Sequence, residues 1–246
     1  MRRFGLLGKN ISYSFSESYF KKKFENEQIN DANYQNFDIQ NITEFSNIIS
    51  KTVNLKGLNV TIPYKEEVIP FLDKLNKKAK KIGAVNTIKI NANGKLIGYN
   101  TDCYGFKKSL QPFLKPNHKK AIILGTGGAS KAVAFTLNEL GIDYIYISRK
   151  PSEFTKITYR NLTEDLIKTH PIIINCSPVG TFPNVDQCPN IPYKFITQNH
   201  ILYDLIYNPE ETKFLKLGKQ YGATTINGSN MLILQAEKAW NIWNKD

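Results

Sequence analysis

A glycine cluster between a buried apolar run and an alanine-rich helical pattern most constrains how this chain folds. Residues 121–124 are typical of a strand, and the helical pattern continues from the cluster to a stop at Gly141. Glycines at such a turn let the backbone approach a phosphate, and the helix N-terminus then faces the anion. Many strand-to-helix turns use glycine for geometry alone, which is the alternative. The candidate pyrophosphate turn comprises Gly125, Thr126, Gly127, Gly128 and Ala129.

Alternating elements on both sides of this turn indicate the fold class. Apolar periodicity predicts strands at 4–8, 33–39, 57–63, 144–147, 172–175 and 201–205, and helices at 17–27, 43–51 and 228–243. Two extended runs around Asn93-Gly94 predict a hairpin over residues 83–99. Strands that alternate with helices favour an α/β protein with mainly parallel sheets, in which ligands bind at the carboxyl ends of the strands.

Length and composition exclude several classes of protein. A chain of 246 residues with 41% hydrophobic residues can form one large or two smaller packed domains. No apolar run approaches the roughly 18 residues of a membrane span, and the run at 4–7 is too short for a signal peptide. We therefore expect a cytoplasmic protein that does not bind membranes.

The cysteines and histidines lack the spacing of a metal site. The sequence contains no CxxC pair, and no histidine stands at a ligand-like interval from another histidine or a cysteine. We therefore expect no metal. The residues concerned are Cys103, Cys176, Cys188, His118, His170 and His200.

The net charge of +12 raises the question of nucleic-acid binding, because clustered lysines and arginines neutralise phosphates. The lysines are dispersed over the whole chain instead. Local groups at 21–23 and 77–81 lie on segments typical of solvated helix faces. We expect a small molecule rather than nucleic acid as the partner, and the sequence leaves both monomer and homodimer open.

Hydroxyl and amide side chains gather near the ends of the first predicted strands. Ser14 and Ser16 bring two hydroxyls to the start of the first helix, where the alternative role for Ser16 is an N-cap. Asn59 and Thr61 fall on one face of the third strand by alternation.

Two charged residues follow strands in the same half of the chain. Lys65 falls at the expected start of a helix, against the preference for acidic residues there, although a solvated surface lysine is the alternative. The predicted hairpin leads to Asp102, which could instead cap a helix that starts near Tyr104.

Several segments resemble the shikimate dehydrogenase family in order and spacing, over nearly the full chain. They are Ser14-Phe-Ser16, Asn59-Val-Thr-Ile-Pro-Tyr-Lys65, Ala84-Val-Asn86-Thr87, Gly98-Tyr-Asn-Thr-Asp102-Cys-Tyr-Gly105, Gly125-Thr-Gly-Gly-Ala129, Asn175-Cys-Ser-Pro-Val-Gly180, Tyr203-Asp-Leu-Ile-Tyr207-Asn-Pro-Glu-Glu-Thr212 and Gly228-Ser-Asn-Met231-Leu-Ile-Leu-Gln235.

The resemblance implies two domains and a reaction. An α/β substrate-binding and catalytic domain with a mainly parallel sheet would comprise 1–103 and 229–246, and a doubly wound Rossmann-like NADP domain would comprise 104–228, with the active site in the cleft between them. The implied reaction is the reversible NADPH-dependent reduction of 3-dehydroshikimate to shikimate in aromatic amino-acid biosynthesis.

The resemblance also implies roles for individual residues. Lys65 and Asp102 would be catalytic, since an ammonium can stabilise and protonate a developing alkoxide and a nearby carboxylate keeps it charged. The implied substrate-binding residues are Ser14, Ser16, Asn59, Thr61, Asn86, Tyr207 and Gln235. The implied cofactor-binding residues are Gly125, Thr126, Gly127, Gly128, Ala129, Ser148, Arg149, Lys150, Cys176, Ser177, Gly228 and Met231.

The residues after the strand at 144–147 bear on cofactor choice. Ser148-Arg149-Lys150 stands where an NAD-preferring fold usually has an acidic residue for the ribose hydroxyls. A guanidinium there suits the 2′-phosphate of NADP, and ordinary exposed turn residues are the alternative.

The chain departs from the family pattern near the first motif. The usual His, Pro and His-Asn pair are replaced by Tyr13, Glu17 and Phe20-Lys21, and Tyr64 precedes the lysine instead of the commoner His. These changes bear on the shape of the carboxylate pocket. Two other functions remain open: a quinate/shikimate dehydrogenase-like paralogue that uses NAD or another hydroxy acid, and a non-enzymatic module that binds nucleotides or nucleic acid.

Overall fold

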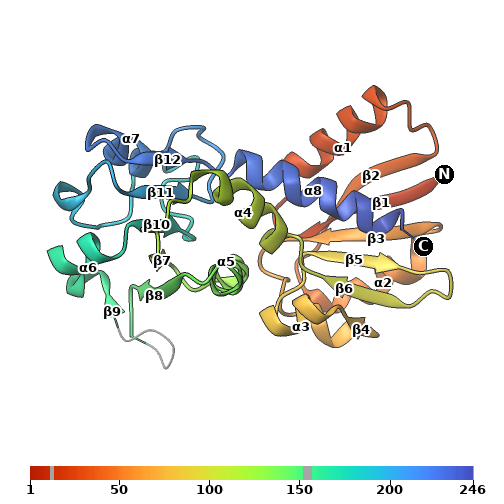
Figure 1. The fold of residues 1–246 in the computed structure, drawn as a ribbon. Coiled ribbons are helices and arrows are strands. Elements are labelled where there is room, and N and C mark those ends of the chain that lie inside the picture. Colours follow the sequence, from red (N-terminus) through yellow and green to blue (C-terminus); the bar gives the residue numbers. More distant parts are fainter. Residues whose placement is uncertain (12–13, 152–156, 246) are drawn as a thin grey trace. The chain divides into compact units, whose positions relative to one another are not determined.

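The chain forms two compact units, and the second is inserted into the sequence of the first. The computed structural model describes residues 1–11, 14–151 and 157–245 (Figure 1). Unit 1 comprises Met1–Thr101 and Ala236–Asp246, and unit 2 comprises Asp102–Gln235. Within the described ranges, no helix has both the length and the apolar character that crossing a bilayer requires.

Unit 1 is built on a sheet that has six strands in the described part of the chain. In sheet order these are β2 (Ala32–Asp38), β1 (Arg2–Gly8), β3 (Leu55–Val60), β5 (Thr87–Ile90), β6 (Leu96–Tyr99) and β4 (Lys74–Leu75). The first three strands are parallel, while β5 runs antiparallel to both β3 and β6. The helices are α1 (Phe15–Asn26), α2 (Phe45–Lys51) and α3 (Lys77–Ile82), with 3₁₀ turns at Ile42–Glu44 and Ile69–Phe71. The predicted strands at 4–8 and 33–39, the helices at 17–27 and 43–51 and the hairpin over 83–99 are confirmed.

The end of β3 differs from the sequence-based expectation. The predicted strand at 57–63 ends at Val60, and a run of turns follows it. Pro63 has no N–H to donate to a neighbouring strand, so the ladder cannot continue through it. Lys65 therefore lies within the turns rather than at the start of a helix, and the prediction of a helix start there is wrong.

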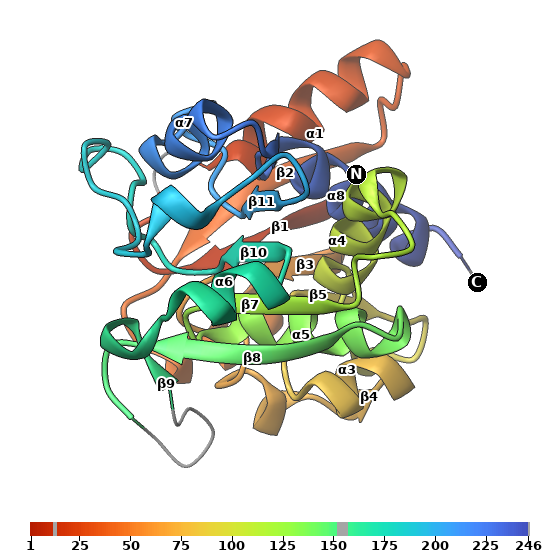
Figure 2. The ribbon, with the colours of Figure 1, turned by 60° about the vertical axis from the view of Figure 1, so that its left-hand side comes forward.

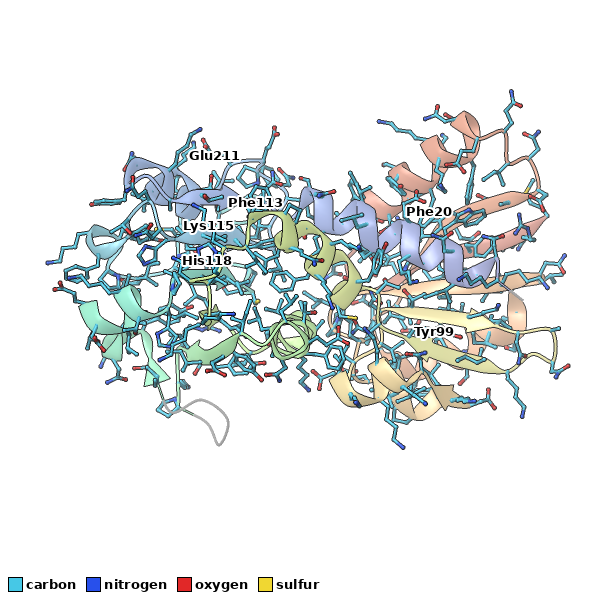
Figure 3. All side chains as sticks on the ribbon, in the orientation of Figure 1. Phe20, Tyr99, Phe113, Lys115, His118 and Glu211 are labelled. Carbon is cyan, nitrogen blue, oxygen red and sulfur yellow. The ribbon has the colours of Figure 1, made fainter. Side chains whose placement is uncertain are left out.

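Apolar side chains cover both faces of the unit 1 sheet. Because successive strand residues point to opposite faces, Leu6 and Leu7 contribute to different clusters. The cluster on the side of α1 contains Phe4, Leu6, Phe20 (labelled in Figure 3), Phe24, Ala236, Ala239 and Trp243. The cluster on the side of α2 and α3 contains Leu7, Phe45, Leu58, Val60, Ala79 and Ile88, among others.

The C-terminal half of α8 (Ser229–Trp243) belongs to the core of unit 1 (Figure 1). Trp243 lies against the central strand at Gly57, where an added Cβ would come within 2.2 Å of the indole Nε1. The indole N–H donates to the carbonyl of Ile88 at 2.9 Å. Only a glycine leaves room for the indole ring at this point of the sheet. The close packing of α8 on β3 therefore depends on Gly57.

Unit 2 contains a second sheet, and all the strand pairs described in it are parallel. Its strands in sheet order are β12 (Thr224–Ile226), β11 (Ile201–Asp204), β10 (Ile172–Asn175), β7 (Lys120–Leu124), β8 (Asp143–Ser148) and β9 (Ile157–Thr158). Its helices are α4 (Asp102–Leu110), α5 (Gly128–Glu139), α6 (Glu164–Thr169) and α7 (Lys213–Gln220), with 3₁₀ turns at Gln111–Phe113, Tyr159–Asn161 and Tyr193–Phe195.

The strand order of unit 2 is that of a doubly wound dinucleotide-binding sheet. From β7 the chain builds β8 and β9 on one side, and then returns to build β10, β11 and β12 on the other side (Figure 1; β7 to β11 also in Figure 2). The direction of winding therefore reverses between β7 and β10. In open parallel sheets the ligand crevice lies outside the carboxyl ends of the strands at this reversal. The predicted Rossmann-like fold is confirmed.

A buried carboxylate joins three segments at the carboxyl edge of this sheet. Asp204, with no exposed surface, accepts hydrogen bonds from the Asn175 side chain at 3.0 Å, the Ile206 N–H at 3.1 Å and the Thr212 hydroxyl at 2.7 Å. Burial raises the pKa of Asp204 from 3.8 to about 6, and these three hydrogen bonds oppose the rise.

We predict that the contribution of Asp204 to stability falls as the pH rises from 4 to 7. The folded-state pKa lies above the ordinary value, so the folded protein holds this proton more tightly than the unfolded chain does. The loss should be on the order of 2–3 kcal/mol, at about 1.4 kcal/mol per pKa unit. Denaturant unfolding of the wild type and of Asp204→Asn at both pH values measures it. The difference in unfolding free energy between the two proteins should shrink toward pH 7, and a constant or growing difference would contradict the prediction.

Candidate functional site

The polar segments of unit 1 meet at one edge of its sheet. Strands β1 and β3 are parallel, so the segments that follow them leave from the same edge. The antiparallel strand β5 begins at that edge, where Thr87 pairs with Asn59, and β6 ends there, where Tyr99 pairs with Thr87. Residues from before β5 and from after β1, β3 and β6 therefore come together, although they are far apart in sequence.

Ser14, rather than Ser16, caps the first helix. The Ser14 hydroxyl accepts a hydrogen bond from the N–H of Glu17 at 3.2 Å, in the geometry of an N-cap. Ser16 is buried inside the first turn of α1, so the alternative that it serves as the N-cap is wrong. Glu17 binds the side chain of Asn36 on β2. The departure at Tyr13 lies outside the described residues.

Two buried asparagines form the centre of this edge. The Asn59 amide donates to the Asn86 carbonyl at 3.3 Å and to the Thr87 hydroxyl at 3.2 Å. The Asn86 oxygen accepts from the Thr101 N–H at 2.6 Å, and its amide donates to the Thr101 hydroxyl at 2.9 Å. Buried amides need such partners because an unsatisfied group costs about 1–3 kcal/mol.

The turn after β3 is anchored on both sides of Lys65. Tyr64 is buried, and its hydroxyl donates to the Ile39 carbonyl at 2.8 Å. The Lys65 carbonyl accepts from the Val85 N–H at 2.7 Å, so the backbone beside the half-buried lysine is fixed. Thr61 directly follows β3, and its N–H donates to the Leu7 carbonyl at 2.9 Å. Tyr64, the departure from the family's His, is thus a core residue.

Asp102 is the first residue of α4 and is buried. It directly follows Thr101, whose backbone is held by Asn86. A carboxylate in the first turn of a helix is favoured by the helix dipole. Since the helix starts at Asp102, the alternative of a cap for a helix beginning near Tyr104 is wrong.

The glycine turn of unit 2 fits a dinucleotide. Gly125 has a φ of +103°, and a Cβ there would lie 3.2 Å from the N–H nitrogen of Ser177, in the loop after β10. Gly127 is exposed at the N-cap of α5, and nothing lies within 4 Å of its absent Cβ. Thr126 is exposed beside it, and Gly128 and Ala129 begin the helix. The turn therefore leaves open space at a helix N-terminus on the β7–β10 reversal, as a pyrophosphate requires.

The loop after β10 is held by hydrogen bonds of both its side chains and its backbone. The Asn175 oxygen accepts from the Ser177 N–H at 3.1 Å and from its hydroxyl at 2.7 Å. Cys176 is held by its N–H, which donates to the Leu124 carbonyl at 2.9 Å. Burial raises the pKa of the Cys176 thiol well above its ordinary value, so the thiol remains protonated.

The cations expected at the adenosine end lie at the end of β8. Arg149 and Lys150 are both exposed, and the Ser148 hydroxyl donates to the Lys150 carbonyl, which shapes the turn. The positive charge of Arg149 acts on Tyr159, where it opposes the rise in pKa that burial causes. Tyr159 therefore lies near this guanidinium.

The remaining predicted residues lie after β11, between β12 and α8, and on α8. Tyr207 is 41% exposed, and it follows the Asp204-bound turn. Gly228 packs so closely that a Cβ would lie 2.1 Å from the Leu205 carbonyl oxygen. Met231 and Gln235 are buried, and the Gln235 amide donates to the Leu232 carbonyl within its own helix at 3.1 Å.

The sequence-based reasoning gave no role to Tyr34, Thr87, Thr101 or Asp204. Each is a buried polar residue on or next to a strand, where its side chain bonds a predicted site residue or its loop. A polar residue in an apolar strand was an available signal for Thr87 and Asp204 alone. In the described ranges, no three His, Cys, Asp or Glu residues are grouped as a metal would need.

Comparisons with known proteins agree with this architecture. A family model described as the shikimate dehydrogenase substrate binding domain matches residues 6–88. The shikimate dehydrogenase (NADP(+)) of Methanococcus vannielii is 40% identical, and the match covers 97% of this chain and 90% of that protein.

Solved structures give the same result. The crystal structure of shikimate dehydrogenase 1 from Peptoclostridium difficile matches with a TM-score of 0.85 and 41% sequence identity. The match covers 99% of this chain and 91% of that chain. The crystal structure of a shikimate dehydrogenase in complex with NADP+ matches with a TM-score of 0.86 and 35% sequence identity. This match covers 99% of this chain and 90% of that chain. The resemblance inferred from the motifs is confirmed, and the chain belongs to the shikimate dehydrogenase family.

Proposed function

We propose that this protein is a shikimate dehydrogenase, which interconverts 3-dehydroshikimate and shikimate with NADP(H). The observation that carries the proposal is the set of polar side chains from four separate segments at one edge of the unit 1 sheet. A small hydroxylated acid offers many hydrogen-bonding groups, and buried amides with fixed orientation are suited to recognise them. The proposed substrate-binding residues are Ser14, Ser16, Asn59, Thr61, Asn86, Tyr207 and Gln235.

Lys65 is proposed to act on the reacting oxygen. Its ammonium stabilises negative charge on the carbonyl oxygen and gives that oxygen a proton, and solvent then reprotonates the amine. The fixed backbone on both sides of the turn supports this role, because a positioned donor needs little reorganisation. Asp102 supplies a carboxylate that accepts a hydrogen bond from a substrate hydroxyl.

NADPH supplies the hydride when it is bound. The turn at Gly125–Ala129 is proposed to hold its pyrophosphate, with Cys176, Ser177, Gly228 and Met231 as further contacts. Arg149 and Lys150, with Ser148 shaping their turn, are proposed to bind the 2′-phosphate of the adenosine ribose. Their exposure at the end of β8 and the absence of an acidic residue from Ser148 to Lys150 support NADP over NAD.

Replacing Lys65 by Ala should lower kcat for shikimate oxidation by roughly 10²–10⁴-fold, because the charge matters most when the alkoxide is present. Shikimate binding measured by calorimetry should change much less. Lys77→Ala, which removes an exposed lysine of α3, serves as the matched control and should keep wild-type turnover. Near-normal turnover in Lys65→Ala would contradict the catalytic role.

Replacing Arg149 by Ala should reduce kcat/KM for NADP by roughly ten- to a hundredfold while changing kcat/KM for NAD little. A charge-assisted hydrogen bond to the 2′-phosphate contributes about 1.5–3 kcal/mol to NADP binding. Each factor of ten in affinity corresponds to about 1.4 kcal/mol. Steady-state rates with each cofactor measure the change. Lys216→Ala, which removes an exposed cation of α7, controls for net charge.

Equal losses for both cofactors in Arg149→Ala would mean that Arg149 supports the fold alone. A wild-type preference for NAD would instead favour the quinate/shikimate dehydrogenase-like paralogue. Assays of the wild type with shikimate and quinate, each with NADP and NAD, distinguish these outcomes.

A further inference from the structure

A continuous series of buried hydrogen bonds runs beneath the proposed substrate-binding edge of unit 1. It links side chains from β2, β3 and β5 and from the segments next to β5 and β6. Its members in order are Tyr34, Asn59, Thr87, Asn86 and Thr101, and all are buried. Asn59 and Asn86 are proposed substrate-binding residues, whereas Tyr34, Thr87 and Thr101 have no assigned role.

The orientation of Asn59 is fixed by a backbone carbonyl. Its Nδ2 donates to the Asn86 carbonyl oxygen, which can only accept, so the other atom of the amide must be the oxygen. That oxygen faces Tyr34, whose hydroxyl therefore donates to it at 2.9 Å.

The hydroxyl of Tyr34 carries a single hydrogen, and Tyr34 gives it to Asn59. Tyr34 thus joins β2 to the side chain of Asn59 on β3. Ser16 on α1 lies near this hydroxyl, where it opposes the rise in pKa that burial causes. No apolar side chain could make the bond to Asn59.

The rest of the series runs in the same direction. Asn59 donates to Thr87 at 3.2 Å, Thr87 donates to the Asn86 oxygen at 3.1 Å, and the Asn86 amide donates to Thr101 at 2.9 Å. The Thr101 N–H donates to the Asn86 oxygen, which fixes the orientation of that amide too. Hydrogen bonds that follow one another in this way polarise and strengthen their neighbours.

Tyr34 itself is placed to orient other residues rather than to touch a ligand. Its ring stacks on Phe20 with centroids 4.5 Å apart, and its backbone pairs with Phe4 in the sheet. Only 6% of the residue is exposed. Burial raises the pKa of Tyr34 well above its ordinary value, so it remains a neutral phenol that can donate.

We propose that Tyr34 is a positioning residue that holds the Asn59 amide in the orientation that binds substrate. The inference rests on the proposed shikimate dehydrogenase function. It assigns to one buried hydroxyl on β2 the task of fixing the asparagine on β3. Loss of that hydroxyl leaves Asn59 in place but leaves its amide oxygen without the Tyr34 donor.

The test is Tyr34→Phe, which removes one oxygen and keeps the ring on Phe20. KM for shikimate should rise roughly tenfold, as expected when a buried partner is left unsatisfied, while kcat changes less than about threefold. KM for NADP should stay at its wild-type value. A rise in KM for shikimate without a change in KM for NADP distinguishes a misplaced substrate site from a general loss of folded protein. Loss of folded protein would lower the rate at all concentrations of both substrates.

Tyr203→Phe is the matched control. Tyr203 is also fully buried, and its hydroxyl bonds Ser109 at 2.7 Å within unit 2. Both variants lose one buried hydroxyl, so their losses in thermal stability should be similar, but only Tyr34→Phe should raise KM for shikimate. An unchanged KM in Tyr34→Phe, or an equal rise in both variants, would overturn the inference.

A second pair of variants covers the case in which Tyr34→Phe does not fold. Thr87→Val removes the next hydroxyl of the series, and Thr87→Ser retains it. The valine variant should raise KM for shikimate and the serine variant should restore it, and equal KM values would overturn the inference. If the wild-type protein does not oxidise shikimate, the proposed function and the inference are both wrong. If the wild type is active, the variants test the inference about Tyr34 alone.

Discussion

The need to satisfy buried hydrogen-bonding groups orders the functional edge of each unit. Asn59 in unit 1 and Asp204 in unit 2 each bond groups from at least two other segments. A loop that moved away would leave a buried donor or acceptor without a partner, at a cost of about 1–3 kcal/mol. These contacts therefore select one arrangement for loops that would otherwise have many.

The two sheets bring their loops together by different topologies. In unit 2 all the described pairs are parallel, so every strand contributes the segment that follows it. In unit 1 the antiparallel β5 is reversed, and it contributes the residue that precedes it, Asn86. One reversed strand thus brings a side chain that a purely parallel sheet would place at the opposite edge.

Patterns along the sequence predicted the elements well and the side-chain partners poorly. The strands on either side of Gly125 follow from local periodicity, which a sequence contains directly, whereas the Rossmann-like winding was implied by the family resemblance. Lys65 was placed at a helix start because a helix was expected directly after the strand at 57–63, but the strand ends at Val60 and turns follow it. Tyr34 and Thr87 fit a strand pattern by size, and only the three-dimensional register shows that their hydroxyls face Asn59.

The contact between Trp243 and Gly57 has a consequence for how the chain is made. Residues on α8 complete the apolar cluster of unit 1, yet α8 follows most of unit 2 in the sequence. During synthesis the strands of unit 2 emerge before that helix, and domains generally fold as units as they appear. The strands of unit 2 can therefore assemble while the sheet of unit 1 still lacks Ala236, Ala239 and Trp243 on the face that carries Phe4. Until α8 is synthesised, that face exposes apolar side chains, and such exposed surface makes a partly folded chain prone to aggregation.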